Sequence, residues 1–116
     1  MSKGRHVILD CTGAARELCL DDARLLTLLT RAAKRHRTNI INSCRYRFGH
    51  SSSPGCTAFL LVDESHISAH TYADDGKIAI DVFTCGDTDA EAIADDIVKA
   101  LGKVSVKKTV LDRFTG

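Results

Sequence analysis

Three strand-like segments follow one another between residues 56 and 83, separated by short polar turns. Residues 56–63 form a continuous apolar run, which is typical of a buried strand. Residues 67–72 are a second candidate strand, and the cluster Asp74-Asp75-Gly76 after them predicts a tight turn. Residues 78–83 alternate, with Ile78, Ile80 and Val82 on one face and Ala79, Asp81 and Phe83 on the other, which predicts a strand.

Two segments outside this region have helical periodicity. The first begins at Asp21 and Asp22 and carries its apolar residues on one face: Leu25, Leu28, Leu29, Ala32 and Ala33. The second begins at Thr88 and Glu91, which form a capping-box pattern, and Gly102 is placed to end it. Its apolar stripe consists of Ala90, Ile93, Ala94, Ile97, Val98 and Leu101.

The order of these elements predicts an α/β (α+β) fold in one domain, residues 1–116. Further strands are expected at residues 5–11, at 39–48 and around Val104–Val110. We expect a two-layer sandwich, in which two helices cover one face of a mainly antiparallel sheet. Both helices are amphipathic, so the other face of the sheet needs a second cover, and a partner chain is one economical solution.

Composition excludes several function classes. Sixteen basic and fifteen acidic residues give a net charge of +1, so we expect neither nucleic acid nor a membrane surface as a partner. No signal peptide or membrane span is visible, which predicts a cytoplasmic protein. Five cysteines without a Cys-x-x-Cys pair argue against a zinc site or a disulfide framework, and no metal is expected. Buried, inert thiols are expected at Cys11, Cys19, Cys44 and Cys56.

Chemistry-bearing residues gather between positions 64 and 85. The chain reads Glu-Ser-His-Ile-Ser-Ala-His-Thr from residue 64 and Ile-Asp-Val-Phe-Thr-Cys-Gly from residue 80. Taken alone, Glu-Ser-His is typical of an exposed polar turn. Taken together, the two strings resemble the self-cleavage and active-site segment of the small prokaryotic S-adenosylmethionine decarboxylases, which are pyruvoyl-dependent proenzymes. The opening Gly4-Arg5-His6 also resembles the start of that family's sequences.

The resemblance implies that the chain cuts itself between Glu64 and Ser65. Ser65 Oγ would attack the Glu64 carbonyl, and elimination from the resulting ester would release a β chain, residues 1–64. The α chain, residues 65–116, would begin with a pyruvoyl group made from Ser65, which forms a Schiff base with the substrate. No external cofactor is implied. Family members form dimers by stacking two sheets face to face, which gives an α/β/β/α arrangement.

The resemblance also implies roles for several other residues. His70 would move the proton during processing, and Cys85 would donate the proton that follows loss of carbon dioxide. Thr57 would supply a processing hydroxyl, and Phe48 a ring for the adenine. The alternatives are a histidine bonded to neighbouring backbone, a buried inert thiol, a strand threonine and a core phenylalanine. His66 matches a family histidine of less clear role.

The chain departs from the family after His70. Many relatives continue His-Thr with Trp-Pro-Glu, whose carboxylate is expected to bind the ribose, whereas this chain has Asp74 at the glutamate position. The implied reaction is decarboxylation of S-adenosylmethionine to the aminopropyl donor for spermidine synthesis. Because of the departure, a pyruvoyl-dependent arginine or ornithine decarboxylase remains an alternative. An uncleaved, non-enzymatic homologue is a second one.

Overall fold

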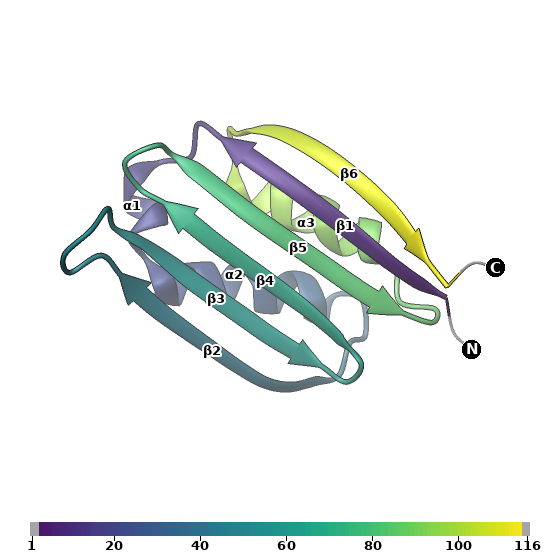
Figure 1. Cartoon of the computed structure of the whole chain (residues 1–116). Coiled ribbons are helices and arrows are strands. Elements are labelled where there is room, and N and C mark those ends of the chain that lie inside the picture. Colours follow the sequence, from purple (N-terminus) through teal and green to yellow (C-terminus); the bar gives the residue numbers. More distant parts are fainter. Residues whose placement is uncertain (1–2, 115–116) are drawn as a thin grey trace.

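Within residues 3–114, which the computed structural model describes, six strands form one antiparallel sheet in the order β2-β3-β4-β5-β1-β6 (Figure 1). The strands are β1 (Gly4–Thr12), β2 (Ile40–Phe48), β3 (Gly55–Val62), β4 (Ser65–Tyr72), β5 (Lys77–Cys85) and β6 (Ser105–Arg113). The helices are α1 (Arg16–Cys19), α2 (Asp22–Lys34) and α3 (Ala90–Leu101), and they lie on one face of the sheet. The two-layer α+β prediction is therefore confirmed.

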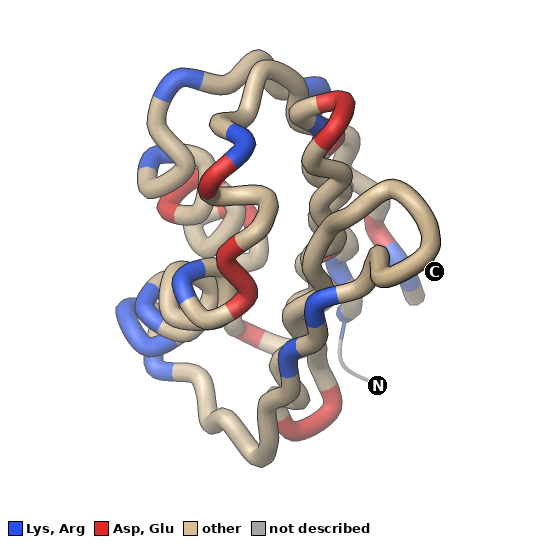
Figure 2. The backbone as a smooth tube through the Cα atoms, turned by 90° about the vertical axis from the view of Figure 1, so that its left-hand side faces the viewer, with Lys and Arg blue, Asp and Glu red and all other residues tan. Residues whose placement is uncertain are grey.

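The core lies between the sheet and the helices. Figure 2 shows these two layers side by side, with the helices on the left and the sheet on the right. Strand residues that alternate with solvent-facing ones fill the core from one side, and the apolar stripes of α2 and α3 fill it from the other. The largest fully buried side chains include Leu9, Leu25, Leu29, Leu60, Ile67, Ile78, Ile80, Ile93 and Ile97. The predicted alternation in β5 is confirmed, because Ile78, Ile80 and Val82 are all buried.

The helix ends follow capping chemistry, with one difference from the prediction. Asp21 caps α2, since its carboxylate accepts a hydrogen bond from the Arg24 N–H at 2.9 Å. The prediction of Thr88 as the cap of α3 is wrong. Asp89 takes that position and accepts from the Ala92 N–H at 3.0 Å, because a carboxylate satisfies the free amides as a hydroxyl does. Gly102 ends α3 in a left-handed conformation, φ +83°, which glycine adopts without strain.

The short helix α1 is absent from the predicted elements. Its four residues contain no periodic pattern, and a buried side chain on β4 anchors it. The Thr71 hydroxyl donates to the Cys19 carbonyl at 2.7 Å and accepts from the Cys56 N–H at 2.8 Å. Thr71 therefore joins α1 to β3 and β4.

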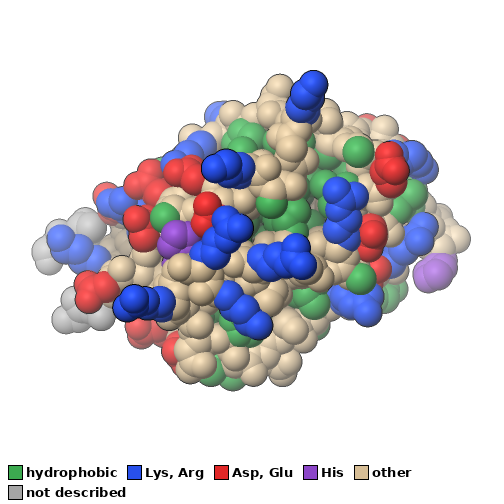
Figure 3. All heavy atoms as spheres, turned by 180° about the vertical axis from the view of Figure 1, so that it is seen from behind, with side chains coloured by type: hydrophobic (Ala, Val, Ile, Leu, Met, Phe, Trp, Pro, Cys, Tyr) green, Lys and Arg blue, Asp and Glu red, His purple; other side chains and the backbone are tan. Residues whose placement is uncertain are grey.

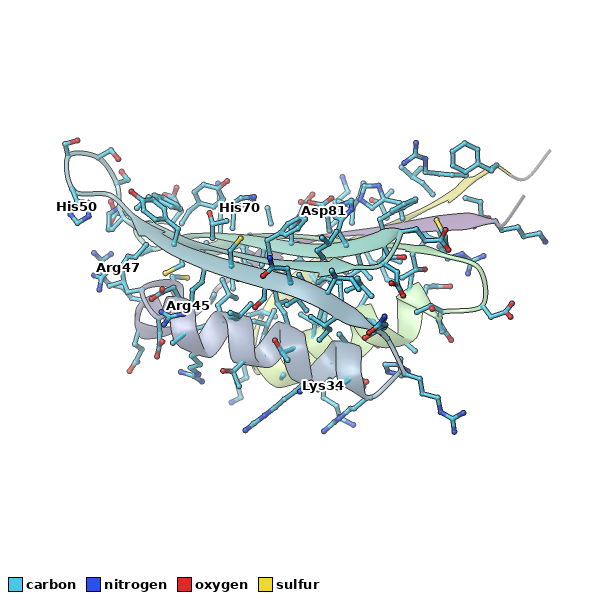
Figure 4. The ribbon with its side chains drawn as sticks, turned by 90° about the horizontal axis from the view of Figure 1, so that it is seen from below. Lys34, Arg45, Arg47, His50, His70 and Asp81 are labelled. Atoms are coloured by element: carbon cyan, nitrogen blue, oxygen red, sulfur yellow. The ribbon has the colours of Figure 1, made fainter. Side chains whose placement is uncertain are left out.

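The other face of the sheet carries no helix. We call it the open face, and Figure 4 shows His70 and Asp81 on it, opposite the helices. Several large apolar side chains on this face are exposed, including Tyr46 at 61% and Leu111 at 47%. Cys44 also lies in the exposed part of β2, so the prediction that it is buried is wrong: an edge strand leaves its side chains uncovered. No helix in the described part of the chain is long and apolar enough to cross a membrane.

Candidate active site

Ser65 lies directly after a tight bend. Strands β3 and β4 form a hairpin in which Val62 pairs with Ser65, so the turn consists of Asp63 and Glu64 alone. Asp63 has φ +48°, a left-handed conformation that aspartate tolerates better than most residues with a Cβ atom. The Glu64–Ser65 peptide bond therefore joins a two-residue turn to the first residue of a strand, and Ser65 is only 8% exposed.

Cys85 lies beside Ser65 at the end of the neighbouring strand, β5. Its backbone N–H donates to Ser65 Oγ at 3.2 Å, and its Sγ lies 4.0 Å from the Glu64 carbonyl oxygen. Gly86 follows with φ +72° and turns the chain away, which leaves the thiol partly exposed at the strand end. We call Glu64, Ser65 and Cys85 the cleavage-site cluster. It places a hydroxyl, a peptide carbonyl and a thiol together.

His70 and Thr57 form a second group. They are directly paired across β3 and β4, and Thr57 Oγ1 is hydrogen-bonded to His70 Nδ1 at 2.8 Å. Both side chains lie on the open face. His70 is five residues from Ser65 along an extended strand, which corresponds to about 16 Å. The odd spacing also puts the two side chains on opposite faces, so within one chain His70 does not meet Ser65.

The predicted substrate-binding residues lie beyond His70, at the end of the sheet away from Ser65. The Phe48 and Tyr72 rings pack with their centroids 6.4 Å apart. Asp74 lies in the turn between β4 and β5 and pairs with the Arg16 guanidinium at 2.8 Å. That hydrogen bond and the Arg16 charge lower the pKa of the Asp74 carboxyl. Phe48 and Asp74 thus lie at the same end of the sheet as His70, and the cleavage-site cluster lies at the other end.

A third group, with no predicted role, occupies the middle of the open face. His6 Nε2 lies 2.9 Å from an Asp81 carboxylate oxygen, which joins β1 to β5. His66 stacks on Phe59 with ring centroids 5.8 Å apart and an interplanar angle of 16°. Burial lowers the pKa of His66, and the neighbouring His6 lowers it further. The sequence could have singled out both His6 and Asp81 as candidate site residues. His6 belongs to Gly-Arg-His, and Asp81 belongs to the string that ends at Cys85.

These groups can transfer an acyl group and move protons. A serine hydroxyl next to a peptide carbonyl can exchange an amide for an ester when nearby groups move protons, and a thiol can return a proton to carbon. Within residues 3–114, no three His, Cys, Asp or Glu side chains are grouped so that they could hold a metal ion.

Known proteins are similar to this chain in sequence and in fold. The sequence pattern of the S-adenosylmethionine decarboxylase family matches residues 5–114. The chain belongs to that family. It is similar to the S-adenosylmethionine decarboxylase proenzyme of Pyrobaculum neutrophilum, at 39% identity over 95% of this chain and 88% of that protein. It is also similar to the arginine decarboxylase proenzyme of Caldivirga maquilingensis, at 35% identity over 95% of this chain and 83% of that protein.

A solved structure supports the same assignment. The crystal structure of the adenosylmethionine decarboxylase from Aquifex aeolicus matches with a TM-score of 0.84 and 31% identity, over 97% of this chain and 91% of that one. The names of these relatives indicate enzymes of the decarboxylase type. The family resemblance and the enzyme class predicted from the sequence are confirmed.

Proposed function

We propose that this chain is a self-processing, pyruvoyl-dependent decarboxylase that acts on S-adenosylmethionine and supplies the aminopropyl donor for spermidine synthesis. The relatives named above support the reaction class. The observation that carries the proposal is the cleavage-site cluster, in which Ser65 follows a two-residue turn and contacts Cys85.

Processing begins at Ser65. Its Oγ attacks the Glu64 carbonyl carbon, the peptide C–N bond breaks, and the chain continues through an ester with a free amine on residue 65. A base then takes the Cα proton of residue 65, and the C–O bond breaks to release residues 1–64 with a carboxylate at Glu64. One water molecule enters and one ammonia leaves, so that residues 65–116 begin with a pyruvoyl group. The Cys85 N–H donates to Ser65 Oγ, which is the oxygen that leaves with the Glu64 carboxylate.

The base for this elimination is His70 of a second copy of the chain. His70 of the same chain lies about 16 Å away along β4, on the other face. The Ser65 side chain points into the helix layer, so a second copy stacked on the open face would bring its His70 to residue 65 from the opposite side.

A two-fold dimer through the open faces completes both sites. One protomer gives the cleavage-site cluster, and its partner gives His70, Thr57, Phe48 and Asp74, so each pair of stacked sheets holds two sites. The exposed apolar side chains of the open face support this assembly, because a monomer in water would leave them uncovered: Tyr46, Leu61, Tyr72 and Leu111. The stacked dimer has the layers α/β/β/α.

During turnover the chain's own residues hold the substrate and move one proton. A pyruvoyl group condenses with a substrate amine and accepts the electrons left when carbon dioxide departs. Cys85 then donates a proton from its thiol to the substrate carbon. The Phe48 and Tyr72 rings would offer a surface for stacking adenine, and the Asp74 carboxylate would accept hydrogen bonds from the ribose hydroxyls.

Decarboxylation of arginine is the second candidate. A relative named as an arginine decarboxylase proenzyme is 35% identical over most of the chain, and Asp74 is already paired with Arg16. That pairing competes with binding to a ribose.

Carbon dioxide release separates the candidates. Purified protein is incubated with S-adenosylmethionine, arginine and ornithine in parallel, with Ser65→Ala as the control. We expect release from S-adenosylmethionine and none from the variant. Release from arginine or ornithine alone would support the second candidate, and release from none of the three would support a non-enzymatic homologue.

A further inference from the structure

We propose that a groove on the outer side of the helix layer binds a small phosphate monoester through two arginines. The groove lies between α2 and α3, away from the open face, and holds a cavity of about 250 Å³. It is lined by Arg24, Thr27, Leu28, Arg31, Ala32, Arg35, Asp96 and Ala100, and we call it the arginine groove. None of these residues takes part in the proposed decarboxylation.

Helix geometry aligns the arginines. Arg24, Arg31 and Arg35 are separated by seven and then four residues, so they lie along one face of α2 and its C-cap. Thr27 and Leu28 lie between the first two on the same face. Figure 3 looks onto this side of the molecule and shows Lys and Arg side chains gathered around a hydrophobic area near its middle.

The groove has an excess of positive charge. Its single carboxylate, Asp96, is already engaged by His36 Nε2 at 2.7 Å and by the Arg35 guanidinium at 4.0 Å. In the part of the chain that the structure describes, neither Arg24 nor Arg31 forms an ion pair. Three guanidinium groups against one carboxylate leave two positive charges, and like charges four residues apart on a helix repel.

A phosphate monoester has the complementary charge and shape. It carries a charge of about −1.5 to −2 at neutral pH. The planar guanidinium fork donates two parallel hydrogen bonds to phosphate oxygens, which a lysine cannot do. Part of the groove lining is apolar, namely Leu28, Ala32 and Ala100, so the organic part of a small ester can rest against it.

The surroundings favour a small ligand over a long polyanion. Glu91 and Asp95 lie nearer the N-terminal end of α3 than the groove, and they pair with Lys108 at 3.2 and 3.3 Å. A nucleic acid or an acidic protein segment that extended past the groove would meet these carboxylates. The net charge of the chain, +1, also gives no long-range attraction for a polyanion.

Methyl NMR of the whole protein tests the site. Phenyl phosphate is titrated into protein labelled at leucine and alanine methyl groups, at constant ionic strength, with phenol and inorganic phosphate as separate probes. We expect saturable shifts at Leu28 and Ala32, stronger with phenyl phosphate than with either separate probe. The double variant Arg24→Gln/Arg31→Gln should weaken binding by about tenfold or more, because each of the two substitutions removes a charge-assisted hydrogen bond to the phosphate. Arg47→Gln removes a charge from β2 outside the groove and should leave binding unchanged.

Three results would overturn the proposal. The first is the absence of saturable shifts at Leu28 and Ala32, and the second is equal affinity in the double variant. The third is tighter, arginine-dependent binding of polyglutamate or RNA, which would assign the groove to a macromolecule. The methyl spectrum of the unliganded double variant shows whether that variant is folded. If it is not, Arg31→Lys is used in its place. Arg31→Lys keeps the positive charge but should bind phenyl phosphate more weakly, because lysine lacks the guanidinium fork.

Discussion

Ser65 and His70 lie on one strand but face opposite sides of the sheet, about 16 Å apart. In the proposed reaction both residues act at the Glu64–Ser65 junction: Ser65 attacks the carbonyl, and His70 takes the Cα proton of residue 65. A second copy of the chain stacked on the open face reconciles these facts, because it brings its own His70 to the Ser65 of the first. The dimer is therefore part of the chemistry in this account.

Complementation between inactive variants should follow from the shared site. Ser65→Ala and His70→Ala should each remain uncut alone, with processing slowed by about 10²- to 10⁴-fold in the histidine variant. In a mixed dimer, the His70→Ala chain keeps Ser65 and meets an intact His70 on its partner. Co-expression should therefore restore cleavage of the His70→Ala chain alone, as seen on a denaturing gel.

A matched pair provides the control. Ser65→Ala and Cys85→Ala lie in the same cleavage-site cluster, so mixing these two should restore no decarboxylase activity. Cleavage of the His70→Ala chain in the absence of a partner with an intact His70 would contradict the shared site.

Thr57 should support processing through His70. Thr57→Val removes the hydroxyl that is hydrogen-bonded to His70 Nδ1, so we expect slower cleavage and a shifted pH dependence of its rate. Thr57→Ser keeps the hydroxyl and should restore both. Rates are measured from fragment appearance between pH 6 and 9. A pH profile that is the same in Thr57→Val and the parent protein would remove Thr57 from this role.

Cys85 should matter for turnover more than for cleavage. Cys85→Ala keeps the backbone N–H that donates to Ser65 Oγ, so the variant should still cut itself. Its decarboxylation rate should fall by about 10²- to 10⁴-fold, the usual contribution of a positioned proton donor. Fragment yield and carbon dioxide release are measured on the same sample. Full activity in this variant would assign the proton to another group.

Acid should destabilise the protein partly through His66. Its pKa lies below the ordinary value of 6.5, because burial and His6 disfavour the charged form. The unfolded chain therefore binds a proton at a pH where the folded one does not, and stability falls as the pH drops through the region of 6.5 and below. Urea unfolding at pH 7 and pH 5 should show a smaller loss in His66→Gln. An equal or larger loss in the variant would contradict this assignment.

Much of the fold follows from local sequence patterns. The period of two in β5 and the apolar stripes of α2 and α3 determine which face each element buries, and the structure agrees with them. Helix α1 could not be found in this way, because four residues give no periodicity and its anchor, Thr71, lies 52 residues from its partner Cys19. Asp89 and Thr88 are adjacent residues that can both cap a helix, so sequence alone did not separate them.

The candidate site residues were predicted one by one from the sequence, whereas their arrangement in space was not. Pairing of β1 with β5 brings His6 to Asp81 across 75 residues of sequence, and no local pattern reports that contact. One clue was available, since the odd spacing from Ser65 to His70 already puts their side chains on opposite faces of a strand.

Thr71 should be important for stability. Thr71→Val would leave the Cys56 N–H and the Cys19 carbonyl without their partner in the core, at a cost of about 1–3 kcal/mol. Thr71→Ser keeps the hydroxyl and should lose less. Urea unfolding of both variants measures the difference, and equal stability of Thr71→Val and the parent protein would show that these groups find other partners.

Intact-mass spectrometry of the purified protein tests self-cleavage most directly. Self-cleavage predicts two fragments, residues 1–64 and residues 65–116, with the second lighter than its encoded sequence by the mass of one ammonia. A single uncut chain of full mass, with an unmodified serine at position 65, would contradict it.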